Sequence, residues 1–405
     1  MSARLDWMIS VDDHVLEPPH VWESRLPAKY RDVGPTIRRD DAGEAWFFEG
    51  KRMPTIGLAA AAGKKREEFS PLPMTYDEMR PGCYDPRARL EDMDRDRVLA
   101  SLCFPSFPRF CGQTFYEAQD RELGLLCVQA YNDWMLEEWA GSAPGRFIPM
   151  IIIPLWDPML AREEIERTAG LGAKAVAFSE NPVPLGLPSI HDRDRYWEPV
   201  FAAAAETGMA LCTHLGSSSK LPRTAPDMPM IATIALQPIN IASTCIDWLF
   251  SGVLPRHPGL KVCLSEGGIG WIPYVLERCD YVVERQGYWA SKGDFEGDLS
   301  SGEAKLVEGT GAELGALPSQ LFRDHLYGCF IDDAHGAQSI EAIGVDNVMI
   351  ETDYPHTDST WPNSMAIAHE RLGYLPEDVQ FKVLRGNAER VFDFTPADLP
   401  DLAGP

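Results

Sequence analysis

Eight short apolar runs, separated by stretches with helical periodicity, are the feature that most constrains the fold of this 405-residue chain. Runs that are apolar on both faces are typical of parallel strands covered on both sides by helices. We predict strands at residues 7–12, 98–104, 147–153, 173–178, 210–213, 261–265, 326–331 and 347–352. The predicted helices cover residues 86–97, 114–140, 158–170, 196–207, 230–251, 270–285 and 335–343. This alternation predicts an α/β fold, namely a closed (β/α)8 or TIM barrel.

The rest of the chain is predicted to form insertions in one barrel domain, residues 1–393, and an irregular C-terminal tail, residues 394–405. Three stretches interrupt the alternation of strands and helices: residues 35–85, 215–229 and 286–323. The first contains Trp46-Phe47-Phe48 followed by Glu49-Gly50-Lys51-Arg52, which predicts a β-hairpin. Loops of this length usually serve function or assembly, so we expect the three insertions to shape the pocket.

The net charge of −24 and the cysteine pattern restrict the partners and the compartment. An acidic chain does not favour non-specific binding to nucleic acid, and no basic run would attract it to an anionic membrane. We see no secretory signal, and no apolar run approaches the ~20 residues that span a bilayer. The nine cysteines are scattered without a Cys-x-x-Cys pair. We therefore expect reduced core thiols in a cytoplasmic protein that binds neither nucleic acid nor membranes.

Residues of the kinds that bind metal ions follow three of the predicted strands. Asp12 and His14 end the first strand, and because they are two residues apart on an extended chain they point the same way. His214 follows the fifth strand and Asp353 follows the eighth. In a closed barrel these strand ends meet at one mouth, where the side chains could hold a divalent metal ion with an open position. Asp13 is expected to point away and to be structural.

Further polar residues near the same mouth are candidates for catalysis and for substrate binding. Asp353 could also take a proton from water or substrate. Glu266, at the end of the sixth strand, could be a further metal ligand, a general base or an orienting group. His356 could contact substrate or support the ligands. Arg109, after the second strand, could grip a substrate carboxylate, and Trp361 could form a pocket wall.

Other catalytic motifs are missing from the sequence. There is no Gly-x-Ser-x-Gly elbow of a serine hydrolase and no phosphate-binding P-loop. The turn Gly267-Gly268-Ile269-Gly270 is too loose to support a dinucleotide site. Its glycines are expected to bring backbone close to the pocket, and the helix that follows could favour an anion at its N-terminus.

A set of short motifs resembles, in order and spacing, those of a known family. They are Ser10-Val11-Asp12-Asp13-His14, Thr213-His214, His257-Pro258-Gly259-Leu260-Lys261, Glu351-Thr352-Asp353 and Arg385-Gly386-Asn387-Ala388-Glu389-Arg390-Val391-Phe392. The chain resembles the amidohydrolase superfamily, in particular the amidohydrolase-2 group related to aminocarboxymuconate-semialdehyde decarboxylase. The resemblance implies a TIM-barrel enzyme, often a homodimer, that acts on a small molecule with one divalent metal ion. By position, Asp12, His14, His214 and Asp353 would be the metal ligands.

Two positions depart from the pattern of that group. Asp12 stands where many members have the first histidine of a His-x-His pair. Zinc is the metal we expect, with manganese or iron as alternatives, and the carboxylate of Asp12 shifts the balance toward these two. Glu266 stands where the decarboxylase has an acid/base histidine, so its role in proton transfer is left open.

Two chemistries compete for this site. We favour hydrolysis of an aromatic or unsaturated carboxylate, amide or lactone, in which a metal ion would activate water and Asp353 or Glu266 would take the proton. The alternative is non-oxidative decarboxylation or hydration of such an acid, in which a protonated carboxyl group delivers a proton to carbon. A non-catalytic metal-binding protein is the remote third possibility, and its mark would be a site closed to water.

Overall fold

All eight predicted strands are present in the computed structural model, which describes residues 5–290, 293–296, 300–303, 305–308 and 314–400. They are β1 (Met8–Val15), β5 (Val98–Pro105), β6 (Phe147–Ile148) with β7 (Met150–Ile151), β8 (Ala175–Ser179), β9 (Ala210–His214), β10 (Val262–Ser265), β13 (Leu326–Phe330) and β14 (Val348–Ile350). The third predicted strand is divided into β6 and β7 at Pro149, whose backbone has no N–H to donate to a neighbouring strand.

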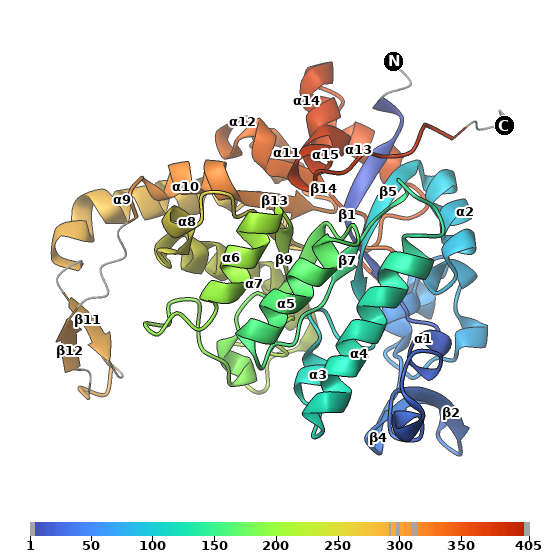
Figure 1. The fold of residues 1–405 in the computed structure, drawn as a ribbon. Helices are drawn as coiled ribbons and strands as arrows, with labels where there is room; N and C mark the ends of the chain where they lie inside the picture. The colour runs from blue at the N-terminus through green and yellow to red at the C-terminus, as the bar shows by residue number, and fades with distance from the viewer. Residues whose placement is uncertain (1–4, 291–292, 297–299, 304, 309–313, 401–405) are drawn as a thin grey trace.

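The barrel strands lie behind and between the helices in Figure 1, and their pairing places them around a ring. β1, β5 and β6 pair in that order, and β7, β8, β9, β10, β13 and β14 continue it, all in parallel. Backbone hydrogen bonds close the ring beyond β14: Asp353 N–H donates to Asp12 O at 2.9 Å, and His14 N–H donates to Tyr354 O at 2.6 Å. The closed TIM barrel predicted from the alternation of strands and helices is therefore confirmed.

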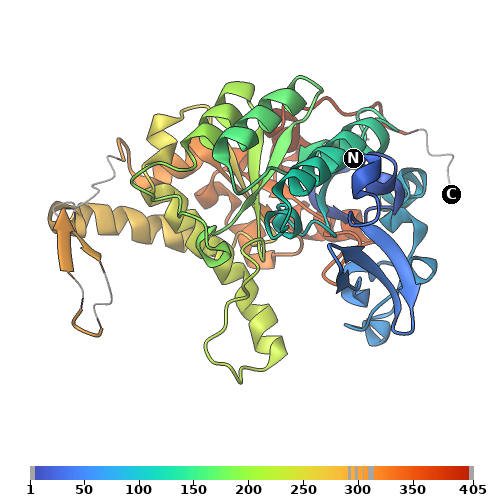
Figure 2. The ribbon, with the colours of Figure 1, turned by 60° about the horizontal axis from the view of Figure 1, so that its bottom comes forward.

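Helices cover the outside of the barrel (Figures 1 and 2). The longer ones are α2 (Pro86–Asp96), α4 (Arg121–Trp134), α5 (Pro158–Ala169), α6 (Glu198–Thr207), α7 (Met230–Phe250), α9 (Ile272–Ala290), α10 (Pro318–His325) and α13 (Ser364–Leu372). The shorter ones are α1 (His20–Glu23), α3 (Gln113–Tyr116), α8 (Val253–Arg256), α11 (Ala334–Gln338), α12 (Ile340–Ile343), α14 (Glu377–Phe381) and α15 (Asn387–Val391).

Two predicted helices are interrupted in the structure. The helix expected over 114–140 is divided into α3 and α4, because the carboxylate of Asp120 accepts the N–H groups of Glu122 and Leu123 and so starts a new helix. The chain continues beyond α4 as a π-helical turn, Met135–Trp139. The helix expected over 335–343 is likewise present as α11 and α12.

The insertions lie outside the barrel strands. Residues 35–85 contain an antiparallel sheet of β2 (Thr36–Asp40), β3 (Gly43–Phe48) and β4 (Lys51–Met53), so the predicted hairpin is confirmed. Residues 215–229 contain no helix or strand. In the third insertion α9 extends to Ala290 and is followed by the hairpin of β11 (Gly293–Glu296) and β12 (Lys305–Glu308), which projects away from the barrel (Figure 2). The tail has no helix or strand over residues 394–400, and residues 401–405 lie outside the described part.

Helix α7 is the described helix that is long and apolar enough to cross a membrane, by length and composition alone. We found no such run in the sequence because polar residues interrupt it. The side chains of Ile241, Cys245 and Trp248, in its C-terminal half, are buried against the barrel. Toward its N-terminus, Met230 and Ile231 are exposed. One such helix is weak evidence for a membrane span, because the core helices of soluble proteins pass the same test of length and composition.

All nine cysteines lie within the described residues, where each is buried and free. The predicted burial of the cysteines in the core is therefore present, and their reduced state stays a prediction. Cys212 of β9 lies in register with Cys263 of β10. Their burial raises the thiol pKa values of Cys212 and Cys329.

A buried carboxylate, Asp96 at the end of α2, links that helix to α13. Its oxygens accept the backbone N–H of Ser364, at 2.8 Å, and the hydroxyl of the same residue. Burial raises the pKa of Asp96 from 3.8 to about 7. The folded state therefore binds a proton more tightly than the unfolded chain. The resulting stabilisation is complete below pH 3.8 and is lost as the pH rises through about 7.

We expect Asp96→Asn to remove this pH dependence while it preserves both contacts with Ser364. Its unfolding free energy should match that of the wild type near pH 4 and exceed it by roughly 2–4 kcal/mol at pH 8. Urea unfolding at the two pH values measures the difference. A change in unfolding free energy between pH 4 and pH 8 that is the same in the wild type and in Asp96→Asn would contradict the assignment.

Candidate metal centre

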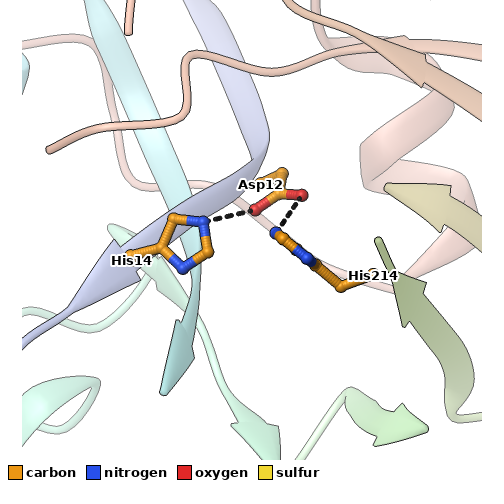
Figure 3. A group of neighbouring side chains, drawn as sticks. All are labelled: Asp12, His14 and His214. Carbon is orange, nitrogen blue, oxygen red and sulfur yellow. Dashed lines mark ion pairs between the residues drawn. The ribbon is translucent and has the colours of Figure 1, made fainter. Parts of the chain in front are cut away.

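Asp12, His14 and His214 meet at the carboxyl-terminal mouth of the barrel (Figure 3). His14 Nε2 lies 3.4 Å from Asp12 Oδ1, and His214 Nε2 lies 3.5 Å from Asp12 Oδ2. Asp353, directly beyond β14, places Oδ1 3.2 Å from His14 Nε2. All four side chains are buried. The structure thus brings the four residues expected to bind metal into one cluster, although they span most of the sequence.

The strand β1 pairs irregularly with β5 where it carries Asp12 and His14, and both side chains leave this strand on the side of the cluster. The register shifts between Ser10 and Asp13, which is the mark of a β-bulge. Asp13 points the other way, as expected, and its carboxylate accepts hydrogen bonds from the hydroxyls of Ser10, Ser101 and Thr352. These contacts anchor the end of β1 so that the two flanking residues are held toward the centre.

Hydrogen bonding and ring stacking orient the two histidines. Nδ1 of His214 lies 2.6 Å from the carbonyl oxygen of Leu215, which assigns the proton to Nδ1 and leaves the Nε2 lone pair facing Asp12. The ring of Phe110 stacks on His214 with centroids 4.1 Å apart. His14 stacks on His356 at 3.6 Å. Burial lowers the pKa of both cluster histidines, that of His214 to about 4, so both are neutral and able to act as ligands at pH 7.

Asp353 is held between two histidines. Its Oδ1 lies 3.0 Å from Nδ1 of His356 in addition to its contact with His14. Burial would raise the pKa of Asp353, but the charge of His356 and the contact with His14 outweigh it and lower the pKa. Asp353 has a backbone φ of 54°, a strained value for a residue other than glycine. The carboxylate is therefore ionised and fixed in direction.

Glu266 stands between the cluster and the open part of the mouth. Its Oε2 lies 3.2 Å from Nε2 of His214, and its side chain is 15% exposed. Its backbone φ is 56°, again strained. The backbone N–H of Glu266 donates to both carboxylate oxygens of Glu351, at 3.2 and 3.3 Å. Burial, followed by the charge of Asp353, raises the pKa of Glu266 well above its ordinary value.

The donor set fits a divalent cation. Asp12 Oδ1 and Oδ2, His14 Nε2, His214 Nε2 and both carboxylate oxygens of Asp353 are buried without a hydrogen-bond partner in the described part of the chain. Buried polar atoms are normally paired, so these atoms mark a place where a ligand would fit. Two groups have donor atoms within 4.8 Å of one another: Asp12 with His14 and His214, and His14 with Asp353 and His356. Neutral imidazoles and carboxylates in such a group suit zinc, manganese or iron.

A cavity of about 430 Å³ adjoins this cluster through Glu266 and Leu215. Trp271 and Ile331 line its apolar part. Glycine 267 is required in its wall, because a Cβ atom there would lie 2.5 Å from Cγ2 of Ile241 in α7. The predicted close approach of backbone is therefore present at Gly267.

The anion expected at the start of the following helix is a side chain of the protein itself. The backbone N–H groups of Ile269 and Gly270 donate to Oδ2 of Asp333, at 2.9 and 2.7 Å. Asp333 caps α11 as well, since its Oδ1 accepts the N–H of Gly336. This turn therefore has no free place for a substrate anion.

The structure does not bring Arg109 or Trp361 to this cavity. Arg109 lies in a separate cavity of about 350 Å³ beside the 35–85 insertion, where Nη2 is 2.5 Å from Oε1 of Glu117. Its Nη1 also donates to the hydroxyl of Ser219. Trp361 packs under Arg80 and donates from Nε1 to the carbonyl of Asp92. The substrate-binding role given to Arg109 therefore stays a prediction without support from the geometry. Trp361 lines an adjoining cavity of about 590 Å³, which shares Asp332 and Asp358 with the first, and its role as a pocket wall stays a prediction.

Two buried carboxylates near the mouth were missed by the sequence reasoning. Glu351 faces the cavity and holds the backbone of Glu266. Its position two residues before Asp353 on an extended chain would have placed it on the same face. Glu180 follows β8, as the other site residues follow their strands, and accepts hydrogen bonds from the hydroxyls of Ser217 and Ser218. It holds the turn that follows His214.

The fold and the cluster together define an α/β-barrel enzyme with a centre suited to a metal ion. A family model described as amidohydrolase matches residues 20–394. The chain therefore belongs to the amidohydrolase family.

Curated relatives match parts of the chain at low identity. One is 2-amino-3-carboxymuconate-6-semialdehyde decarboxylase of Dictyostelium discoideum, 25% identical over 51% of this chain and 54% of the relative. Another is gamma-resorcylate decarboxylase of Rhodococcus jostii, 27% identical over 52% of this chain and 64% of the relative. The chain thus matches less than two thirds of the length of each.

Solved structures share the fold over almost the whole chain. An amidohydrolase of Mycobacterium avium subsp. paratuberculosis aligns with a TM-score of 0.70 and 22% identity, covering 95% of this chain and 97% of the other. The 5-carboxyvanillate decarboxylase of Sphingomonas paucimobilis aligns at 0.63 and 22%, covering 96% and 99%. A dihydroxybenzoic acid decarboxylase of Polaromonas, solved with bound manganese and 2-nitroresorcinol, aligns at 0.56 and 18%, covering 97% and 98%.

Proposed function

We propose that this amidohydrolase is a non-oxidative decarboxylase of an aromatic or unsaturated carboxylic acid. The observation that carries the proposal is a buried donor set that suits a cation and lies directly beside a partly apolar cavity. The names of the two curated relatives, both decarboxylases, support the choice of reaction. Hydrolysis, which we favoured from the motifs, receives less support from these comparisons.

Asp12, His14, His214 and Asp353 would hold the divalent ion, and zinc, manganese or iron would suit these ligands. When bound, the ion would anchor the carboxylate and an adjacent oxygen of the substrate and withdraw electron density from the carbon skeleton. Phe110, stacked on His214, and Leu215 would shield this end of the site from water. The apolar side chains of Trp271 and Ile331 would pack against the rest of the substrate.

Glu266 is the group placed to deliver the proton. It lies on the cavity side of the cluster, and it belongs to neither of the close donor groups in the described residues. In the proposed step the bond between carbon and carboxylate breaks, and its electron pair stays on the carbon. The proton of the Glu266 carboxyl group then moves to that carbon, carbon dioxide leaves, and Glu266 is reprotonated from solvent. Glu351 positions Glu266 through its backbone N–H.

The proposal is tested by incubating the metal-loaded enzyme with a panel of hydroxybenzoates and unsaturated acids in D2O. We expect release of carbon dioxide and one deuterium at the carbon that carried the carboxylate, measured by proton NMR. A panel of lactones and amides serves as the comparison. Hydrolysis of these without carbon dioxide release from any acid would overturn the proposal in favour of a hydrolase.

The ligand set also predicts metal content and metal-dependent stability. We expect about one zinc, manganese or iron ion per chain by plasma mass spectrometry. Chelation should lower the melting temperature by several degrees, because the ion binds the folded state and offsets repulsion between Asp12, Asp353 and Glu351. Asp12→Asn should lose most of the metal. If the protein takes up none of the three ions and melts at the same temperature with and without chelator, the proposed metal centre is refuted.

A further inference from the structure

The cavity of about 590 Å³ that Trp361 lines adjoins the cavity beside the metal centre. Asp332 and Asp358 line both, so a bound molecule could extend from one cavity into the other. The adjoining cavity lies between the 35–85 insertion, which contributes Lys64 to its wall, and the loop beyond β14. The function proposed above makes no use of this space.

Backbone hydrogen bonds join the two segments that form the adjoining cavity. The N–H groups of Ala61 and Ala62 in the insertion donate to the carbonyl oxygen of Pro355 beyond β14, at 2.7 and 3.0 Å. These bonds place the backbone of the following residues, Lys64 and Arg66, beside the loop beyond β14. Both side chains line the cavity.

The two cationic side chains in this wall lack an acidic partner. Neither Lys64 nor Arg66 forms an ion pair with another residue in the described part of the chain. Within that part, the hydrogen bond of Lys64 Nζ goes to Sδ of Met74 at 3.8 Å, a weak acceptor. Lys64 is half-buried, so its charge is screened less than that of an exposed lysine.

The carboxylates of the same wall do not balance both cations. Asp332 already accepts a hydrogen bond from Nε of Arg371, at 2.6 Å. Asp358 forms no ion pair with Lys64 or Arg66 among the residues described, and a single carboxylate can balance only one of the two. The wall therefore carries an excess of positive charge, which favours an anionic group of a ligand.

Neutral hydrogen-bond donors line the same cavity. They include the hydroxyl group of Thr357 and the side-chain amide of Asn363. Oγ of Ser359 accepts the backbone N–H of Trp361 at 3.2 Å, and its own hydroxyl hydrogen can still be donated. A guanidinium group, an ammonium group and neutral donors together suit an anion with several oxygen atoms, such as a carboxylate, sulfonate or phosphate.

We propose that Lys64 and Arg66 form an anion-binding subsite at the far end of the substrate cavity. The proposal rests on the decarboxylase function above only for the near end, where the reacting carboxylate would lie at the metal centre. The subsite binds a second acidic group of the same molecule, beyond the shared wall of Asp332 and Asp358. Lys64 and Arg66 therefore select substrates by the length and the charge of the end that does not react.

The test compares two rigid probes of equal length, biphenyl-4,4′-dicarboxylate and its monoamide, 4′-carbamoylbiphenyl-4-carboxylate. Isothermal titration calorimetry at low salt measures their affinities for the metal-loaded enzyme. We expect the dicarboxylate to bind at least about tenfold more tightly, the effect of one charge-assisted contact. The double variant Lys64→Gln with Arg66→Gln should abolish this preference and leave the affinity for the monoamide unchanged.

The matched control is the double variant Lys65→Gln with Arg87→Gln. It removes the same two charges from exposed positions that line neither of the two cavities, so it should keep the preference for the dicarboxylate. Circular dichroism checks that both double variants are folded. An equal loss of preference in the control would overturn the subsite, because the overall charge of the protein would then account for the effect.

Equal affinities for the two probes in the wild type, no binding of either probe, or a preference that survives Lys64→Gln with Arg66→Gln would also overturn the subsite. Carbon dioxide release from the panel of acids separates this proposal from the proposed function. If the preference depends on Lys64 and Arg66 but no acid is decarboxylated, the subsite stands and the decarboxylase function fails. If acids are decarboxylated but the preference is absent, the function stands and the subsite fails.

Discussion

Asp353→Asn is expected to lower kcat by roughly 10²–10⁴-fold while it leaves a folded protein. The ionised carboxylate is held by His14 and His356 and faces the place where the metal ion would bind. An amide keeps the shape but loses the charge that balances the cation. We therefore expect weaker metal binding together with the loss of turnover. Steady-state kinetics at saturating metal, metal analysis and circular dichroism measure the three properties.

The matched control for this variant is Asp346→Asn. Asp346 lies at the opposite end of β14 and pairs on the surface with Nζ of Lys382 at 2.8 Å. Exposed pairs of this kind contribute little, so the control should keep its activity and its metal. An Asp353→Asn enzyme that retains more than about a tenth of wild-type turnover, well above the loss expected for such a group, would refute the role of Asp353.

Glu266→Gln is expected to keep the bound metal and to lower kcat by roughly 10²–10⁴-fold. Glutamine preserves the size of the side chain and its contact with His214, but it has no carboxyl proton to deliver. The reverse half-reaction isolates this step. Incubated in D2O with the decarboxylated product, the wild type should exchange hydrogen for deuterium at the reacting carbon, and Glu266→Gln should not.

Three outcomes for Glu266→Gln have different meanings. Loss of rate with retained metal makes Glu266 the proton donor, whereas loss of the metal makes it a ligand. No change in either property would show that Glu266, directly beyond β10, is neither the proton donor nor a metal ligand. Glu277→Gln, at an exposed position on α9, is the control for removing an acidic group from the same region.

Much of the barrel could be predicted from the sequence because the signals for its elements are local. Each apolar run, such as residues 210–213 or 261–265, became a parallel strand near its predicted bounds. Helix boundaries were harder to predict. The helix expected over 114–140 is interrupted at Asp120, whose side chain competes for backbone N–H groups that an uninterrupted helix would use.

The candidate metal ligands could also be anticipated, because residues at the carboxyl ends of parallel strands must share one mouth. That rule brings Asp12, His214 and Asp353 together without any knowledge of their distances. It also applies to Glu180, which we missed although it follows β8 in the same way. Conversely, Arg109 satisfies the rule but turns toward Glu117 and the insertion sheet.

The sequence by itself determined the class of fold, the order of its elements and the kinds of donor atoms at the mouth, since periodicity and residue type are read along the chain. Only the tertiary structure decided which side chains share the cavity. The contact between Glu266 and Glu351, residues 85 positions apart, exists because β10, β13 and β14 pair side by side. The gathering of carboxyl groups at the cavity has the same origin: packing brings residues from separate loops together there and places Arg109 in another cavity.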